Sequence, residues 1–114
     1  MNVNQHLDFD ALNTLKEIME DDFVFLIETF LQDSASRVET LAELINGQDS
    51  DAIRRAAHSF KGSCSNVGAL HLASLCGHLE HKGLNNDFNG VKDDFVEIKQ
   101  EFSVVQQLLH DFLQ

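Results

Sequence analysis

The chain has 114 residues, of which 43% are hydrophobic, and a formal net charge of −11 at pH 7. This length suits one domain with a single core, and the hydrophobic content excludes a disordered chain. Only eight residues are Lys or Arg and they form no dense basic run, which argues against nucleic acid and anionic membrane surfaces as partners.

Targeting signals are absent from the sequence. No apolar run reaches the length of a membrane span. Residues 1–6 carry neither a basic region nor an apolar segment, so we expect no signal peptide. These features predict a cytoplasmic protein. A free-standing protein and a domain of a larger sensor kinase both fit the sequence.

The first two predicted helices follow from their caps and their apolar spacing. A short helix begins at Asp8 or Asp10, either of which can accept hydrogen bonds from the first turn. Its apolar residues fall on one side: Phe9, Leu12, Leu15 and Ile18. A long helix follows, opened by Asp21 or Asp22 and ended by Gly47 as a C-terminal cap. Its apolar residues recur at steps of three and four, as expected for an amphipathic helix.

Three further helices are predicted after Gly47. One starts at Asp49 or Ser50 and stops near Gly68, the next covers about residues 69–83, and the last begins at residue 91. No proline interrupts any of them. Short connections favour antiparallel neighbours. We therefore predict an all-α protein, an up-and-down antiparallel four-helix bundle with an additional short N-terminal helix, forming one domain over residues 1–114.

The third predicted helix carries a histidine on its polar side. A helical wheel places His58 about 140° from the apolar stripe, toward solvent. Arg54, Lys61, Gly62 and Ser65 are its neighbours on the same surface. A glycine inside a helix costs about 1 kcal/mol relative to alanine, so Gly62 suggests that access to the imidazole matters. An ordinary surface histidine beside an incidental glycine fits the same wheel.

The residues around His58 resemble a known motif. Ala57-His58-Ser59-Phe60-Lys61-Gly62, followed by Gly68-Ala69, resembles the signature A-H-x-L-K-G of the histidine-containing phosphotransfer (HPt) domain, which has a G-A shortly after. Phe60 stands where leucine is commoner, a conservative change on the buried side. The resemblance extends along nearly the whole chain, because its length and helix spacing fit this family of small helical bundles.

The resemblance implies a phosphorelay intermediate. His58 would accept a phosphoryl group from a hybrid sensor histidine kinase or a receiver aspartate, and pass it to the aspartate of a response-regulator receiver domain. A neutral imidazole is a suitable nucleophile near pH 7. Lys61 and Arg54 would offset the added charge, Gly62 would leave room, and Ser65 would hydrogen-bond the histidine or the phosphoryl group.

The machinery for ATP-dependent phosphorylation is missing from the sequence. No glycine-rich phosphate loop is present, so we expect no kinase activity from the chain alone. The chain is expected to bind no cofactor, and Mg²⁺ is expected on the partner receiver domain, as the resemblance implies. Docking needs exposed apolar groups near His58. Leu12, Leu15 and Phe23 are candidates, although each also fits a buried core position.

Two alternatives to the relay remain open. In the first alternative, the chain is a non-phosphorylated four-helix module that only binds receiver domains. In the second, it is a metal-binding bundle that uses His71, His78 and His81, which fall on one flank of a predicted helix. Surface histidines without a role fit that flank equally well. Cys64 and Cys76 are expected to be reduced, buried thiols, since they form no Cys-x-x-Cys pair. We expect a monomer that binds no metal.

Overall fold

Six α-helices make up nearly all of the structure, a computed structural model that describes residues 2–114. They are α1 (Val3–His6), α2 (Phe9–Met19), α3 (Asp22–Gly47), α4 (Ser50–Asn66), α5 (Leu70–Leu84) and α6 (Val91–Leu113). Residues 2–114 contain no strand, so the all-α prediction is confirmed. None of these helices has both the length and the apolar composition that a membrane crossing requires.

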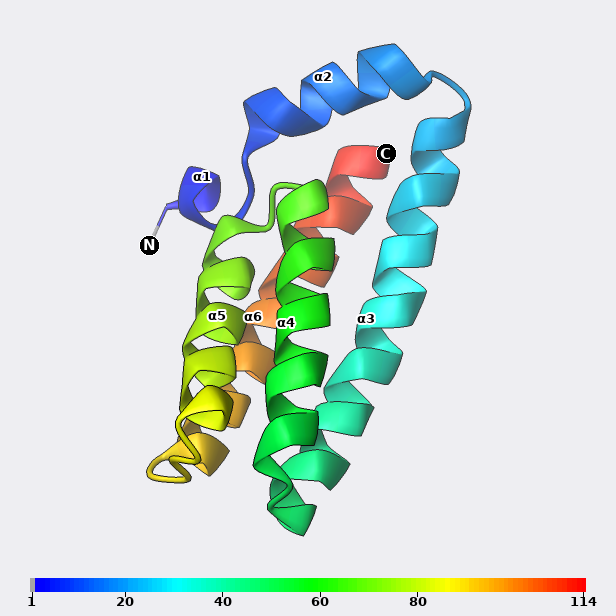
Figure 1. Cartoon of the computed structure of the whole chain (residues 1–114). Helices are drawn as coiled ribbons and strands as arrows, with labels where there is room; N and C mark the ends of the chain where they lie inside the picture. Colours follow the sequence, from blue (N-terminus) through cyan, green and yellow to red (C-terminus); the bar gives the residue numbers. More distant parts are fainter. Residues whose placement is uncertain (1) are drawn as a thin grey trace.

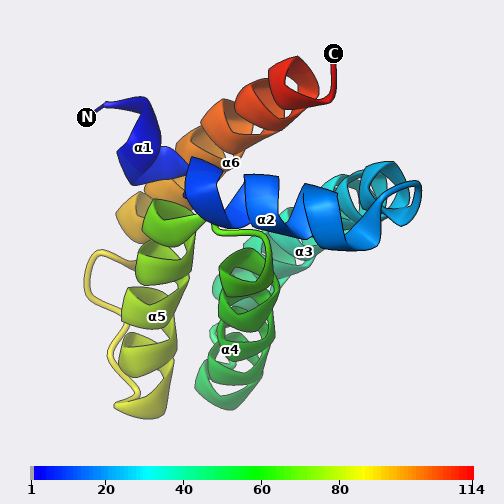
Figure 2. The ribbon, with the colours of Figure 1, turned by 90° about the horizontal axis from the view of Figure 1, so that it is seen from above.

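The four long helices α3 to α6 lie side by side, and successive helices run in opposite directions (Figure 1). Helix α4 packs against α3 and α5, and α6 packs against the same two helices. Figure 2 shows α2 lying across one end of this group. Each long helix therefore hides one side in a shared core and leaves another side for solvent.

The N-terminal region differs from the prediction of a single short helix. A one-turn helix, α1, precedes α2 and packs against α5 and α6. Asn2 and Gln5 stabilise it as a capping box, in which the Asn2 side chain accepts from the Gln5 backbone N–H and the Gln5 side chain accepts from the Asn2 N–H at 2.8 Å. Such a short helix has no apolar periodicity, so the sequence pattern does not reveal it.

Two of the predicted caps, Asp8 and Asp49, are confirmed, whereas the Asp21 side chain before α3 makes no capping hydrogen bond. The Asp8 carboxylate accepts from the Ala11 N–H at 3.0 Å, and the Asp49 carboxylate accepts from the Ala52 N–H at 3.1 Å. The prediction that Gly47 caps α3 was wrong. Gly47 is the last helical residue, and the left-handed position after it belongs to Gln48, whose φ is 55°.

Helix α4 turns its apolar side to the core, as the wheel predicts. Ile53, Ala57, Phe60 and Cys64 are all buried, with at most 2% of their surface exposed. Burial of such side chains contributes about 1.5–3 kcal/mol for each large one. This burial fixes the rotation of α4 about its axis, and so holds the opposite side of the helix toward solvent.

Helices α4 and α5 approach each other closely at Gly83. A Cβ added to Gly83 would lie 2.9 Å from the backbone nitrogen of Arg54 and 2.9 Å from the carbonyl oxygen of Ser50. Backbone atoms cannot move aside as a flexible side chain can. Glycine at this position therefore sets the spacing between α4 and α5.

Replacing Gly83 with alanine tests this spacing. We expect the Gly83→Ala variant to lose about 1–2 kcal/mol of unfolding free energy, because the clash exceeds the gain in helix propensity. Urea unfolding measures the change. The matched control is Gly47→Ala, where an added Cβ meets nothing within 4 Å. Equal stability of the two variants would contradict the account.

Candidate functional site

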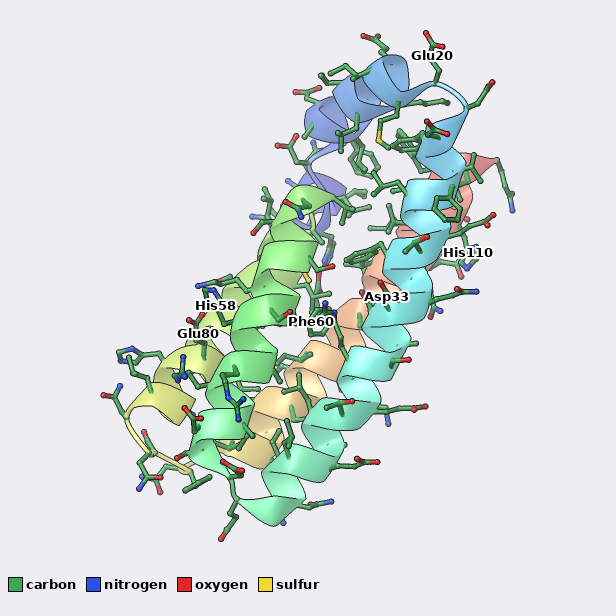
Figure 3. All side chains as sticks on the ribbon, turned by 45° about the vertical axis from the view of Figure 1, so that its right-hand side comes forward. Glu20, Asp33, His58, Phe60, Glu80 and His110 are labelled. Carbon is green, nitrogen blue, oxygen red and sulfur yellow. The ribbon has the colours of Figure 1, made fainter. Side chains whose placement is uncertain are left out.

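His58 projects from the solvent side of α4, and 65% of its side chain is exposed. Figure 3 places His58 and Glu80 close together, and Phe60, which is fully buried, on another side of α4. The exposure follows from the rotation of α4 that the buried side chains impose. The imidazole is therefore within reach of another molecule.

Glu80 of α5 connects His58 and Lys61. One of its carboxylate oxygens, Oε2, lies 2.8 Å from Nδ1 of His58, and the other, Oε1, lies 2.6 Å from Nζ of Lys61. The hydrogen bond from Lys61, followed by that from His58, lowers the pKa of Glu80 below its ordinary value. The carboxyl group is therefore ionised at neutral pH.

The ionised Glu80 determines which nitrogen of His58 carries the proton. A carboxylate only accepts hydrogen bonds, so Nδ1 of His58 must donate its N–H to Oε2. In the neutral imidazole, Nε2 then holds a free lone pair. The geometry thus presents Nε2 as a nucleophile, with the negative charge of Glu80 placed to stabilise positive charge on the ring.

Two glycines lie near His58 and Lys61, Gly62 on α4 and Gly77 on α5. A Cβ on Gly62 would have no atom within 4 Å, so nothing in the fold itself requires glycine there. A Cβ on Gly77 would lie 3.3 Å from Cδ of Lys61, so Gly77 leaves room for the Lys61 side chain to reach Glu80. Gly77 therefore accommodates the ion pair between Lys61 and Glu80, whereas the fold leaves the choice of glycine at position 62 without a packing reason.

Two residues expected to support a phosphoryl group have other partners in the structure. The guanidinium of Arg54 donates to the Asp51 carboxylate at 2.8 Å, one turn before His58. The Ser65 hydroxyl donates to the Lys61 backbone carbonyl at 3.0 Å. Neither side chain is hydrogen-bonded to His58. Lys61 is the expected supporting residue that the structure does link to His58, through Glu80.

The candidate docking residues need a correction. Leu12 is completely buried and Phe23 is 2% exposed, so neither side chain offers surface to a partner. Helix α2 lies across the end of the long helices and turns Leu12 into their core. Leu15 is partly buried against the same core. The expectation that Leu12 and Phe23 contact a partner is therefore wrong, and Leu15 retains part of its surface.

The histidines considered for a metal site have separate surroundings. The His78 ring lies 4.0 Å from the Asp94 carboxylate, and the His81 ring is 3.1 Å from the amide nitrogen of Asn85. His71 instead lines a hollow that contains neither His78 nor His81. Within the described part of the chain, no three His, Cys, Asp or Glu side chains converge as metal ligands would. The structure thus lends no support to a metal-binding bundle.

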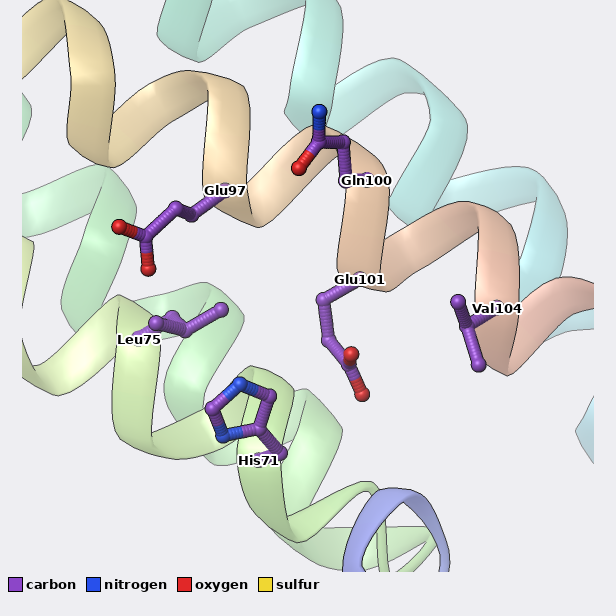
Figure 4. A pocket seen from close by; sticks show the side chains of 6 residues that line it. All are labelled: His71, Leu75, Glu97, Gln100, Glu101 and Val104. Atoms are coloured by element: carbon purple, nitrogen blue, oxygen red, sulfur yellow. The ribbon is translucent and has the colours of Figure 1, made fainter. Parts of the chain in front are cut away.

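The hollow beside His71 lies between α5 and α6 and has a volume of about 290 Å³ (Figure 4). Its lining combines acidic and apolar side chains: His71, Leu75, Glu97, Gln100, Glu101 and Val104. At its edge, Nδ1 of His6 lies 2.7 Å from the nearly buried Glu101 carboxylate. This contact fastens α1 onto α6, and the hollow lies apart from His58.

The two cysteines are buried and free, as expected. The neighbouring Cys76 thiol, together with burial, raises the pKa of Cys64 far above its ordinary value. A protonated, buried thiol is a poor nucleophile and a poor metal ligand. These cysteines therefore act as core side chains.

Glu80 and Gly77 were missed by sequence reasoning. Both belong to α5, and Glu80 is 22 residues away from His58. Their role depends on how α4 and α5 align, which no local pattern reveals. A Glu near a Gly on a helix is too common to be a signal by itself.

Comparisons with known proteins identify the family and agree with the fold. The model of the Hpt domain family matches residues 26–112. The sensor protein TorS of Escherichia coli (strain K12) is 34% identical over 87 residues, which cover 75% of this chain but only 9% of TorS. The crystal structure of histidine-containing phosphotransfer protein B from Pseudomonas aeruginosa PAO1 superposes with a TM-score of 0.91 at 36% identity, covering 93% of this chain and 92% of that one.

The link between Glu80 and His58 predicts a particular imidazole tautomer. We expect ¹⁵N NMR of the neutral ring to report a protonated Nδ1 in the wild-type protein, and a shift toward the Nε2-protonated form in Glu80→Ala, because the acceptor is lost. Glu97→Ala, an exposed glutamate on α6, is the matched control. Identical tautomer populations in the wild type and Glu80→Ala would refute the assignment.

Proposed function

Because the chain belongs to the Hpt domain family, we propose that it is a phosphorelay intermediate that carries a phosphoryl group on Nε2 of His58. The observation that supports this most is the exposed imidazole whose Nδ1 is held by Glu80 at 2.8 Å while Nε2 stays free. A phosphotransfer role in a phosphorelay agrees with the similarity to TorS and to phosphotransfer protein B. The chain spans only a small part of TorS, whose other activities are not assigned to it.

The proposed chemistry is an exchange between His58 and a partner's aspartyl phosphate. The Nε2 lone pair attacks phosphorus, the N–P bond forms, and the P–O bond to the aspartate breaks, which returns a free carboxylate to the partner. The ring becomes positively charged in this step, and Glu80 stabilises that charge through Nδ1–H. In the reverse direction the phosphoryl group leaves Nε2 for a carboxylate oxygen.

The neighbours of His58 have distinct proposed roles. Lys61, one turn after His58 on the same helix, neutralises part of the charge on Glu80 and in this proposal also offsets the charge of the phosphoryl group. Gly62 leaves the path to Nε2 clear. Arg54 contributes its positive field from one turn away, and Ser65 is the weakest assignment, since its hydroxyl is engaged with the Lys61 carbonyl.

The proposed partners are a hybrid sensor histidine kinase and the receiver domain of a response regulator. Mg²⁺ on the receiver would supply the charge stabilisation for which this chain offers no ligand cluster among residues 2–114. We propose that the chain works as a monomer in the cytoplasm, where the free thiols of Cys64 and Cys76 stay reduced.

We propose that α3 to α6 serve this role as an up-and-down antiparallel four-helix bundle. The alternating directions of these helices and the packing of each against two others support this topology. In this arrangement α4 and α5 are neighbours both in sequence and in space. The short connection between them therefore aligns Glu80 with His58.

Replacing His58 with glutamine is the primary test. The His58→Gln variant should lose all phosphoryl acceptance, because the amide is not a nucleophile, while it keeps the fold and binds the receiver with nearly unchanged affinity. Radiolabel transfer from each phosphorylated kinase and receiver of the host, with the wild type in parallel, measures acceptance. Retained transfer in the variant would rule out His58 as the acceptor, whereas a wild type that binds the receiver but takes up no radiolabel would favour a module that acts by binding alone.

A bulky residue at position 62 separates function from folding. We expect Gly62→Leu to be as stable as the wild type or up to about 1 kcal/mol more stable, because leucine is the better helix former and meets no clash. Phosphoryl transfer should nevertheless fall about tenfold or more, because the side chain displaces the incoming partner.

Gly47→Leu is the matched control for this experiment. Position 47 is also helical with open space around it, but it lies at the end of α3. This control should transfer at the wild-type rate. Undiminished transfer in Gly62→Leu would show that the glycine is incidental.

A further inference from the structure

Basic residues gather around His58 although the chain as a whole is acidic. Of the eight Lys and Arg residues, four lie on or against α4: Arg37, Arg54, Arg55 and Lys61. Arg37 belongs to α3 and reaches α4, where its Nη1 donates to the Ser59 hydroxyl at 2.8 Å. It therefore touches the residue directly after His58.

Three of these four cations already have a carboxylate. Lys61 is paired with Glu80 at 2.6 Å. Arg54 and Arg55 both bind Asp51, at 2.8 Å and 3.1 Å. Surface pairs of this kind satisfy the charge even where they add little stability.

Arg37 differs, because its recorded partner is a neutral hydroxyl. No ion pair joins it to any carboxylate within residues 2–114. Its Nε is buried and makes no hydrogen bond in the described structure. A guanidinium has five N–H donors. Nη1 of Arg37 donates to Ser59 and Nε is buried, so an incoming acidic group would bind the remaining N–H groups of the two Nη atoms. Arg37 is the uncompensated cation beside the phosphorylation site.

A hollow next to Arg37 offers room for such a group. It lies between α3 and α4, has a volume of about 200 Å³, and is lined by Ser36, Arg37, Thr40 and Ala56. The hydroxyls of Ser36 and Thr40 are further donors beside the guanidinium. A side-chain carboxylate fits this donor set, because a guanidinium binds it in a forked geometry.

We infer that Arg37 is a specificity-determining residue, which binds an acidic side chain of the receiver domain that docks over His58. This inference rests on the proposed function. Arg37, which lines the hollow, donates to Ser59, the residue after His58, and in this proposal the receiver that docks over His58 extends to the α3–α4 side of the helix. With the whole chain at a net charge of −11, a local cation is what steers an acidic partner to this side.

Transfer kinetics with a receiver that exchanges phosphoryl with the wild type test the inference. Arg37→Ala should lower kcat/KM about tenfold at low salt, because KM rises while kcat stays the same. The difference in kcat/KM from the wild type should shrink as the salt concentration is raised. Arg37→Lys should have a kcat/KM between those of Arg37→Ala and the wild type, because lysine keeps the positive charge but not the forked hydrogen-bonding geometry of the guanidinium. Lys92→Ala, an exposed cation on α6, is the control and should leave kcat/KM unchanged.

A purely structural role for Arg37 predicts a different pattern. Ser59→Ala removes the hydrogen bond between α3 and α4 but keeps the Arg37 charge, so we expect transfer within about twofold of the wild type. If Ser59→Ala lost transfer and thermal stability as much as Arg37→Ala does, Arg37 would only be joining two helices, and the inference would fall.

A small phosphoryl donor distinguishes a role of Arg37 in binding the partner from a role in binding the phosphoryl group. With phosphoramidate in place of the receiver, Arg37→Ala should be phosphorylated at the wild-type rate. An equal loss with this donor would mean that Arg37 acts on the phosphoryl group, which overturns its role in recognition.

Failure of the proposed function and failure of the role of Arg37 give different results. If the wild type exchanges phosphoryl with no receiver, or His58→Gln still does, the proposed function fails and this inference fails with it. If the wild type exchanges and Arg37→Ala matches it at every salt concentration, the inference about Arg37 fails alone.

Discussion

The carboxylate of Glu80, held between His58 and Lys61, is the interaction on which the site depends. It joins α4 to α5, fixes the imidazole tautomer, and holds Lys61 next to the reacting ring. Its placement depends in turn on glycine. Gly83 allows the two backbones to approach, and Gly77 makes room for the Lys61 side chain. The exposed histidine thereby presents an Nε2 atom with a free lone pair.

Charge near His58 differs from the charge of the whole chain. The overall balance argues against nucleic acid as a partner, yet half of the basic residues surround α4. A strongly acidic chain with a local group of cations repels most anionic surfaces and still attracts an acidic site at one place. Composition thus argues against whole classes of partner, whereas the structure shows where the basic residues gather.

Local patterns predicted what depends on local structure. Asp8 and Asp49 cap their helices, and His58 faces solvent because the residues opposite it are apolar. The features that the sequence did not predict depend on packing between helices. Glu80 required the alignment of α4 with α5, and the burial of Leu12 required the position of α2 across the bundle end. Neither the alignment of α4 with α5 nor the position of α2 produces a periodic pattern in the sequence.

In the proposed relay, Nε2 of His58 carries the phosphoryl group while Nδ1 remains bound to Glu80. Heteronuclear NMR of the phosphorylated, ¹⁵N-labelled protein measures this most directly, through coupling between phosphorus and the ring nitrogens. The account predicts ³¹P coupling to Nε2 and a proton retained on Nδ1. Coupling to Nδ1, or phosphorus on a residue other than His58, would contradict it.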